Sequence, residues 1–103
     1  TSKTLEKFFN PDNFVFARNE MELVHDGELI RLDRLVMFDD ALWILDYKRN
    51  YFEFQQADYQ AQLERYREAC RLLFPAARIR CALVTVDGKL WDLDSPEENI
   101  ARA

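Results

Sequence analysis

Two short stretches hold the residues that could do chemistry: Leu32-Asp33-Arg34 and, further along the chain, Asp46-Tyr47-Lys48. Residues 29–38 and 42–48 around them are rich in Val, Ile, Leu, Phe and Trp, which favours β-strands, and Asp39-Asp40 supplies a turn between them. If that turn is a two-residue hairpin loop, Asp33 lies directly opposite Asp46. The sequence therefore predicts two carboxylates side by side on neighbouring strands.

A third acid can join this row from the preceding strand, predicted over residues 14–24. His25-Asp26-Gly27-Glu28 is a strong hairpin signal with Asp-Gly at the turn, and its pairing places Glu20 opposite Asp33. Side chains repeat every two residues along a strand, so a second row shares this face. That second row is Glu22, Arg31 and Lys48. Glu22 replaces Glu20 as the third acid if the register is shifted.

Carboxylates opposed in this way need a counter-charge. Facing Cβ atoms on a sheet are about 5 Å apart, and at an effective dielectric of about 20 two carboxylates repel by roughly 3 kcal/mol. Hard oxygen ligands suit Mg²⁺ or Mn²⁺, and Lys48 would lie over whatever anion the metal holds. The alternative is that these acids are solvated charges on the wet face of a meander.

The order of the motifs resembles that of the PD-(D/E)XK nuclease superfamily. More narrowly, it resembles the RecB-type nuclease domain at the C-terminus of AddA-like and UvrD-like helicase–nuclease proteins. The resemblance rests on Asp33, on Asp46-Tyr47-Lys48 and on Gln62-x-x-x-Tyr66, and it runs from about Phe14 to about Leu93. It implies a restriction-endonuclease-like core and a Mg²⁺-dependent deoxyribonuclease, an exonuclease of DNA recombination and repair that works with helicase domains.

The resemblance also implies roles for individual residues. Asp33 and Asp46 would bind Mg²⁺ or Mn²⁺ with help from the Tyr47 carbonyl, and the metal would lower the pKa of a bound water. Lys48 would hold the nucleophile or the phosphate. Glu20 would be an outer ligand or a base that orients the water.

A rival function stays open. The family usually has a Gly three residues before the first Asp, where this chain has Ile30, and a His on an upstream helix, which this chain lacks. These departures favour a nuclease-like DNA-binding or docking domain of a helicase that has lost catalysis, whereas Asp33, Asp46 and Lys48 favour the enzyme. A third possibility is a structural interaction domain of another class.

The sheet that holds these residues is predicted to have one apolar face, covered by a helix over residues 58–74. In that helix Gln62 and Tyr66 are four residues apart and therefore neighbours, and the resemblance implies that they orient the lysine or a DNA phosphate. The predicted apolar face consists of Val15, Ala17, Met21, Leu23, Ile30, Leu32, Val36, Phe38, Trp43, Leu45 and Tyr47. The predicted helix stripe consists of Tyr59, Leu63, Tyr66, Cys70 and Leu73, with Glu64, Arg65, Arg67, Glu68 and Arg71 on its wet side.

The remaining elements complete an α/β fold. Residues 2–9 predict a short helix, and residues 78–86 predict a strand that returns by a crossover and pairs in parallel with an earlier one. Asp87-Gly88 predicts a turn into a last short strand at residues 90–93. Residues 49–57 are predicted to be a loop, whose aromatic side chains could stack on bases. The expected sheet is mixed, an antiparallel meander plus a crossover strand, with flanking helices.

Composition narrows the function. We expect one domain over residues 1–103, because 49% of the residues are hydrophobic and 14% aromatic. The net charge of −5 argues against a general nucleic-acid binder, so any DNA contact must be local or supplied by neighbouring domains. The chain opens on Thr1, which suggests a piece of a larger protein, and the resemblance implies that this piece is the C-terminal part of a helicase–nuclease.

The cysteines and the hydropathy pattern suggest a compartment. Cys70 and Cys81 have neither C-x-x-C spacing nor a His cluster, so we expect no zinc site and no disulfide framework. No apolar run of about 18 residues predicts a membrane span. We therefore expect a cytoplasmic protein without a membrane partner.

Overall fold

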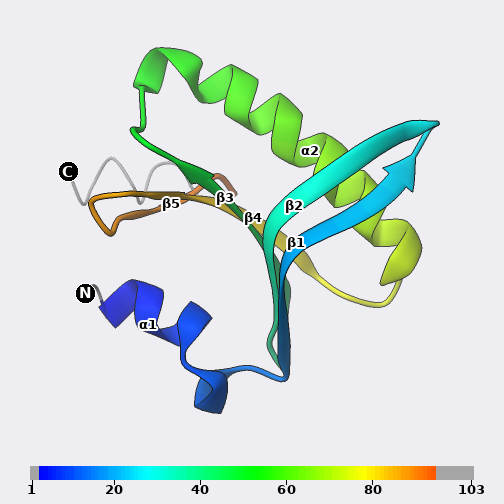
Figure 1. The fold of residues 1–103 in the computed structure, drawn as a ribbon, viewed down its shortest axis with the longest axis horizontal. Coiled ribbons are helices and arrows are strands. Elements are labelled where there is room, and N and C mark those ends of the chain that lie inside the picture. The colour runs from blue at the N-terminus through cyan, green and yellow to red at the C-terminus, as the bar shows by residue number, and fades with distance from the viewer. Residues whose placement is uncertain (1–2, 95–103) are drawn as a thin grey trace.

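The computed structural model describes residues 3–94 as a five-stranded mixed sheet with a helix on either side (Figure 1). The sheet order is β1-β2-β3-β4-β5. The strands are β1 (Phe16–His25), β2 (Glu28–Met37), β3 (Leu42–Lys48), β4 (Ile79–Thr85) and β5 (Leu90–Asp92). The helices are α1 (Lys3–Phe9) and α2 (Gln56–Leu73), with short 3-10 turns at Pro11–Asn13 and Glu53–Gln55. The predicted α/β class and mixed sheet are confirmed.

The turns set the predicted register. Asp26 and Gly27 have φ values of 52° and 76°, the left-handed pair that a tight hairpin needs, and Glu22 faces Arg31 across β1 and β2. In the next antiparallel pair Arg34 faces Leu45. Strands β3 and β4 then pair in parallel, as the crossover through α2 predicts.

The sheet has two buried faces, so the prediction of a single apolar face was wrong. On the α2 side, Leu35, Ile44 and Leu83 belong to one core cluster with Leu63 of the helix. On the α1 side a second cluster surrounds Phe8. Its other buried members are Val36, Ala41, Trp43, Leu45 and Ala82. Central strands next to a parallel crossover are buried on both faces, which a meander alone does not require.

The error arises from a break in side-chain alternation that β1 and β2 share. Leu32 and Leu35 belong to the same α2-side cluster although they are three residues apart. Opposite this point Glu20 has a φ of 53°, a conformation that is uncommon for a non-glycine residue. Glu20 and Asp33 are missing from the ladder, but the pairs on either side keep the register. Strict alternation of side chains across this break predicts Val36 and Phe38 on the α2 side of the sheet, whereas both lie on the α1 side.

Several other side chains differ from their predicted environment. Val15, Tyr47 and Leu73 were predicted to be buried and are 63%, 44% and 51% exposed. Arg67 was predicted on the wet side of the helix, but only 13% of its side chain is exposed. Helix α2 begins at Gln56, so the end of the predicted loop at residues 49–57 is helical.

Buried Arg34 ties α1 to the sheet. Its Nε and Nη2 atoms donate to the Phe8 carbonyl at 3.2 and 2.9 Å, and its Nη1 donates to Asn19 Oδ1 at 2.7 Å. The ring of Phe9 lies 4.5 Å from the guanidinium carbon. A charged side chain is stable here because its donors are satisfied by a carbonyl and an amide.

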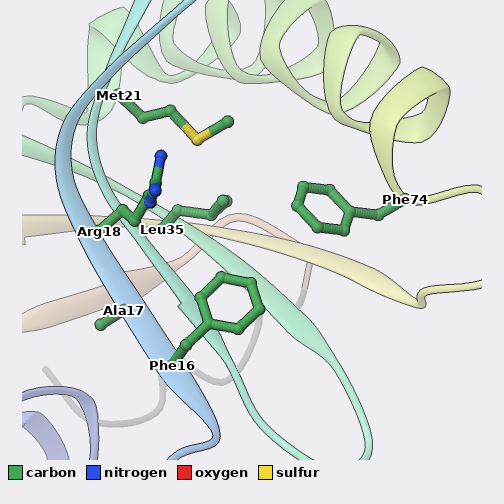
Figure 2. A pocket seen from close by; sticks show the side chains of 6 residues that line it. All are labelled: Phe16, Ala17, Arg18, Met21, Leu35 and Phe74. Carbon is green, nitrogen blue, oxygen red and sulfur yellow. The ribbon is translucent and has the colours of Figure 1, made fainter.

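An apolar hollow of about 410 Å³ remains between β1 and the C-terminal end of α2. Figure 2 shows Phe16 and Met21 from β1, Leu35 from β2 and Phe74 just after the helix pointing into it. Helix α2 therefore does not cover the outer part of the sheet as closely as its centre.

Candidate active site

Strands β2 and β3 bring Asp33 and Asp46 together. The β2–β3 ladder ends at the pair Arg34–Leu45, so the two acids come directly after it. Asp33 Oδ2 accepts a hydrogen bond from the backbone N–H of Tyr47 at 2.8 Å, and Asp33 is close enough to Asp46 to raise the pKa of its carboxyl group. Asp46 continues the row of Leu42 and Ile44, which lies on the α2 side of β3.

Asp46 is the most strongly perturbed acid among residues 3–94. Only 6% of the residue is exposed, and this burial is the main reason that its pKa is raised from 3.8 to about 6. The hydrogen bond with Asp33 and the charge of Asp33 act in the same direction, while Lys48 acts against them. A carboxyl group with such a pKa is ionised at neutral pH but only weakly stabilised in that form.

Lys48 is the direct counter-ion of Asp46. Its Nζ atom lies 3.1 Å from Asp46 Oδ2, and 32% of its side chain is exposed. Asp46 Oδ2 is buried and accepts no hydrogen bond of good geometry from the described residues, so this ion pair is its main contact. The Lys48 side chain therefore lies between the buried Asp46 carboxylate and the solvent.

Gln62 and Tyr66 of α2 lie beside these charges. Gln62 Nε2 donates to the Tyr66 hydroxyl oxygen at 3.0 Å. Burial raises the pKa of Tyr66, and the charge of Asp46 raises it as well, while Lys48 lowers it. The structure thus places the predicted helix pair next to Asp46 and Lys48.

The predicted third acid does not complete a cluster. Glu20 Oε1 forms an ion pair with Arg31 Nη2 at 2.8 Å. It lines a hollow of about 410 Å³ that Asp33, Arg34 and Tyr47 also line. Glu22 is exposed and faces Arg31. Of the two candidates, only Glu20 shares a hollow with Asp33.

A divalent cation fits this site with two carboxylates rather than three. Within residues 3–94 no group of three or more His, Cys, Asp or Glu side chains could hold a metal ion. Mg²⁺ is often held by one or two carboxylates together with waters and substrate phosphate. Asp33, Asp46 and the Tyr47 carbonyl supply hard oxygen donors, and Lys48 Nζ lies 3.1 Å from Asp46 Oδ2 on the same group. The residues present therefore fit Mg²⁺ or Mn²⁺.

Two features of the site did not follow from the sequence pattern. Asn19 and Arg34 face each other in the ladder, and both line the hollow beside Asp33. Their shared position in the predicted register was the available signal. Of the loop aromatics, Tyr51 stacks on Trp91 at a centroid distance of 4.0 Å, whereas Phe52 and Phe54 are exposed.

Comparisons with protein-family models and with curated proteins found no match for the chain. None of the helices in the described part of the chain is long and apolar enough to cross a membrane. Any functional assignment therefore depends on the residues and their geometry.

Proposed function

We propose that the chain is a Mg²⁺-dependent DNA nuclease domain with a restriction-endonuclease-like core. One observation carries the proposal: Asp33, Asp46 and Lys48 converge at the end of β3 and lie beside Tyr66 of α2. A buried acid whose pKa is raised, here Asp46, with a second acid and a lysine counter-ion beside it, is an arrangement more typical of functional sites than of solvated surfaces. The order of these motifs along the chain agrees with the resemblance to the RecB-type nucleases.

The roles of the residues follow from their contacts. The Asp33 and Asp46 carboxylates and the Tyr47 carbonyl would hold Mg²⁺ or Mn²⁺. When bound, the ion supplies an activated water and charge stabilisation for the phosphodiester. Lys48 is oriented by its ion pair with Asp46 and would hold the attacking water or a phosphate oxygen.

Helix α2 contributes orientation to the same site. Tyr66, fixed by Gln62, presents its hydroxyl group beside Asp46 and Lys48 and would orient the lysine or a phosphate. Glu20 would act from the α1 side, once released from Arg31, as the base that orients the water. This assignment places every proposed role on a strand or on a helix.

The proposed setting is a larger helicase–nuclease that acts as an exonuclease in DNA recombination and repair. The net charge of −5 supports this setting, because a domain with this charge attracts DNA poorly by itself. Helicase domains of the same or a partner chain would supply most of the DNA affinity, and the cytoplasm is the expected compartment.

A second candidate function is a nuclease-like DNA-binding or docking domain without catalysis. The observation in its favour is the ion pair between Glu20 and Arg31, which keeps the third acid away from the Asp33–Asp46 pair. The two candidates make opposite predictions for cleavage.

The deciding experiment is cleavage of linear DNA with Mg²⁺ or Mn²⁺ by wild type and by Lys48→Ala. The variant removes a positive charge beside the metal site without removing a ligand, so we expect cleavage to fall by about two orders of magnitude or more while metal still binds. Lys89→Ala is the matched control, because Lys89 is 64% exposed and pairs with Asp87 rather than with an acid of the site. Equal cleavage by wild type and Lys48→Ala would remove the lysine from the mechanism, and no cleavage by wild type would favour the second candidate.

A further inference from the structure

Four arginines gather around one surface hollow of about 480 Å³ where the C-terminal half of α2 meets the start of β4. Arg67 and Arg71 come from the helix, and Arg78 and Arg80 come from the turn and the strand that follow it. Asp94 is the only acid among the residues that line this hollow. The chain has 14 Lys and Arg residues and an acidic net charge, so four arginines at one hollow form a local positive site on an acidic domain.

Arg67 is fixed at the inner side of the hollow. Its Nη1 atom donates to the Ile79 carbonyl at 2.8 Å, and its Nη2 atom donates to Asp94. Its Nε atom lies 3.4 Å from Glu64 Oε1 but is buried without a hydrogen-bond acceptor of good geometry. Only 13% of the side chain is exposed. This guanidinium is therefore rigid, and one of its buried donors is unsatisfied.

Arg80 is held in a similar way from the strand. Its Nη2 atom lies 2.5 Å from Asp92 Oδ2, and its guanidinium lies 4.8 Å from the centre of the Trp43 ring. Its Nε atom is 3.5 Å from Asp94 Oδ2 and, like that of Arg67, is buried without a well-aligned acceptor. Buried donors of this kind are rare in folded proteins. Both inner guanidinium groups are therefore held in place by neighbouring carboxylates, and each has one poorly aligned Nε donor.

The two outer arginines are free. Arg71 and Arg78 are exposed, and neither guanidinium group has an ion pair or a hydrogen bond within residues 3–94. Both nevertheless line the hollow that Arg67 and Arg80 border. The arrangement combines two oriented guanidinium groups with two that are available to a ligand.

We propose that this hollow, the arginine site, binds a phosphate group of a nucleic-acid backbone. Guanidinium groups present pairs of donors that match phosphate oxygens, and the exposed Arg71 and Arg78 are available to an anion that enters the hollow. The proposal rests on the proposed function, because it takes DNA as the ligand of the domain.

The position of the arginine site defines a path for a bound DNA strand. Leu42 faces Ile79 at one end of the parallel pair β3–β4, and Lys48 faces Thr85 at the other. These ends are six residue steps apart, which corresponds to roughly 20 Å at the rise of a β-strand. DNA that reaches the Asp46–Lys48 end could therefore be held at a second phosphate several nucleotides away.

The test measures binding without metal, so that it does not depend on cleavage. A labelled single-stranded oligonucleotide of about 20 nucleotides is titrated in EDTA with wild type, with Arg71→Gln/Arg78→Gln and with Arg18→Gln/Arg65→Gln. The control double variant removes the same two charges from exposed arginines on β1 and the outer side of α2. We expect the Arg71/Arg78 variant to raise Kd by about tenfold or more and to reduce the slope of log K against log salt by about 1.4. We expect the control to change Kd by less than about threefold.

Three outcomes are decisive. Equal weakening by the two double variants would overturn the arginine site, because charge alone would then explain binding. Inorganic phosphate that displaces the oligonucleotide better than chloride at equal ionic strength would assign the hollow to free phosphate and overturn the backbone ligand. If binding depends on Arg71 and Arg78 but wild type does not cleave with Mg²⁺ or Mn²⁺, the arginine site stands and the nuclease proposal fails.

Discussion

Burial and charge oppose each other most strongly at Asp46. The carboxyl group lies under α2, and its pKa of about 6 means that ionisation in the folded state is unfavourable. Relative to the ordinary value of 3.8, each unit is worth about 1.4 kcal/mol. The ionised side chain at neutral pH therefore costs the metal-free fold up to about 3 kcal/mol, even with Lys48 beside it.

Replacing this charge should stabilise the metal-free domain in a pH-dependent way. The folded carboxyl group binds its proton more tightly than the unfolded one, so wild type gains stability as the pH falls from above 6 towards 3.8. The amide side chain of the Asp46→Asn variant does not bind a proton in this pH range, so it contributes no such pH dependence. We expect the variant to be more stable than wild type at pH 8, by up to about 3 kcal/mol, and equally stable near pH 4.

Urea unfolding at pH 8, 6 and 4 measures this difference. Glu53→Gln removes an exposed carboxylate from the segment between β3 and α2. This control variant should show no comparable pH dependence. A stability difference between Asp46→Asn and wild type that is the same at all three pH values would show that Asp46 does not titrate near pH 6.

At the scale of elements, the connection between α1 and the sheet depends on one side chain. Arg34→Met removes the three hydrogen bonds to the Phe8 carbonyl and Asn19 while keeping an apolar side chain of similar length. Hydrogen bonds from a charged group contribute about 1.5–3 kcal/mol, and a buried carbonyl is left unsatisfied. We expect the free energy of unfolding to fall by about 3 kcal/mol and the amides of α1 to exchange faster.

Denaturant unfolding and amide hydrogen exchange check this expectation. Arg18→Met, on the exposed side of β1, is the matched control and should change the stability by less than about 0.5 kcal/mol. Unchanged exchange in α1 of the Arg34 variant would mean that the packing of Phe8 alone holds the helix.

How far the elements could be predicted depended on the kind of signal. Asp26-Gly27 and Asp39-Asp40 mark turns through local chemistry, so the register of β1, β2 and β3 followed from them. The break at Glu20 and Asp33 has no such mark, because a glutamate at positive φ is not a turn signal. The two-faced core therefore could not be predicted by counting alternate residues. Arg67 was misplaced for a related reason, because its partner Asp94 follows only after the crossover.

At the scale of the whole molecule, a bound cation should be visible as added stability. A ligand that binds only the folded state contributes about 2.7 kcal/mol at a hundredfold excess over Kd. For a domain of this size that corresponds to a rise in Tm of several degrees or more. We expect the Tm of wild type to rise by this amount with Mg²⁺ or Mn²⁺ at neutral pH. We expect the Tm of Asp33→Asn and of Asp46→Asn to rise little.

Thermal melts of the three proteins with and without metal provide the measurement. The gain in wild type should fade below about pH 6, because protons then compete for the Asp46 carboxyl group. Equal shifts in all three proteins, or none in wild type at millimolar metal, would support the solvated-face alternative.

The overall charge could be read from composition, but its distribution could not. The net charge of −5 correctly describes the average of the chain. Arg67 and Arg71 lie on α2, whereas Arg78 and Arg80 come after the helix, and the two pairs share a hollow only because the chain turns from α2 into β4. Composition therefore describes the average charge of the chain but not the arginine site.

The twisted backbone at Glu20 also bears on how the protein behaves in a crowded solution. Strand β1 lies at the edge of the described sheet, and a long exposed edge can recruit a strand from another molecule and start aggregation. A positive φ in the middle of the strand spoils the regular spacing of donors and acceptors that such a partner would need, and Arg18, Glu20 and Glu22 add exposed charges nearby. The local irregularity that breaks the alternation therefore also opposes the addition of a foreign strand at this edge.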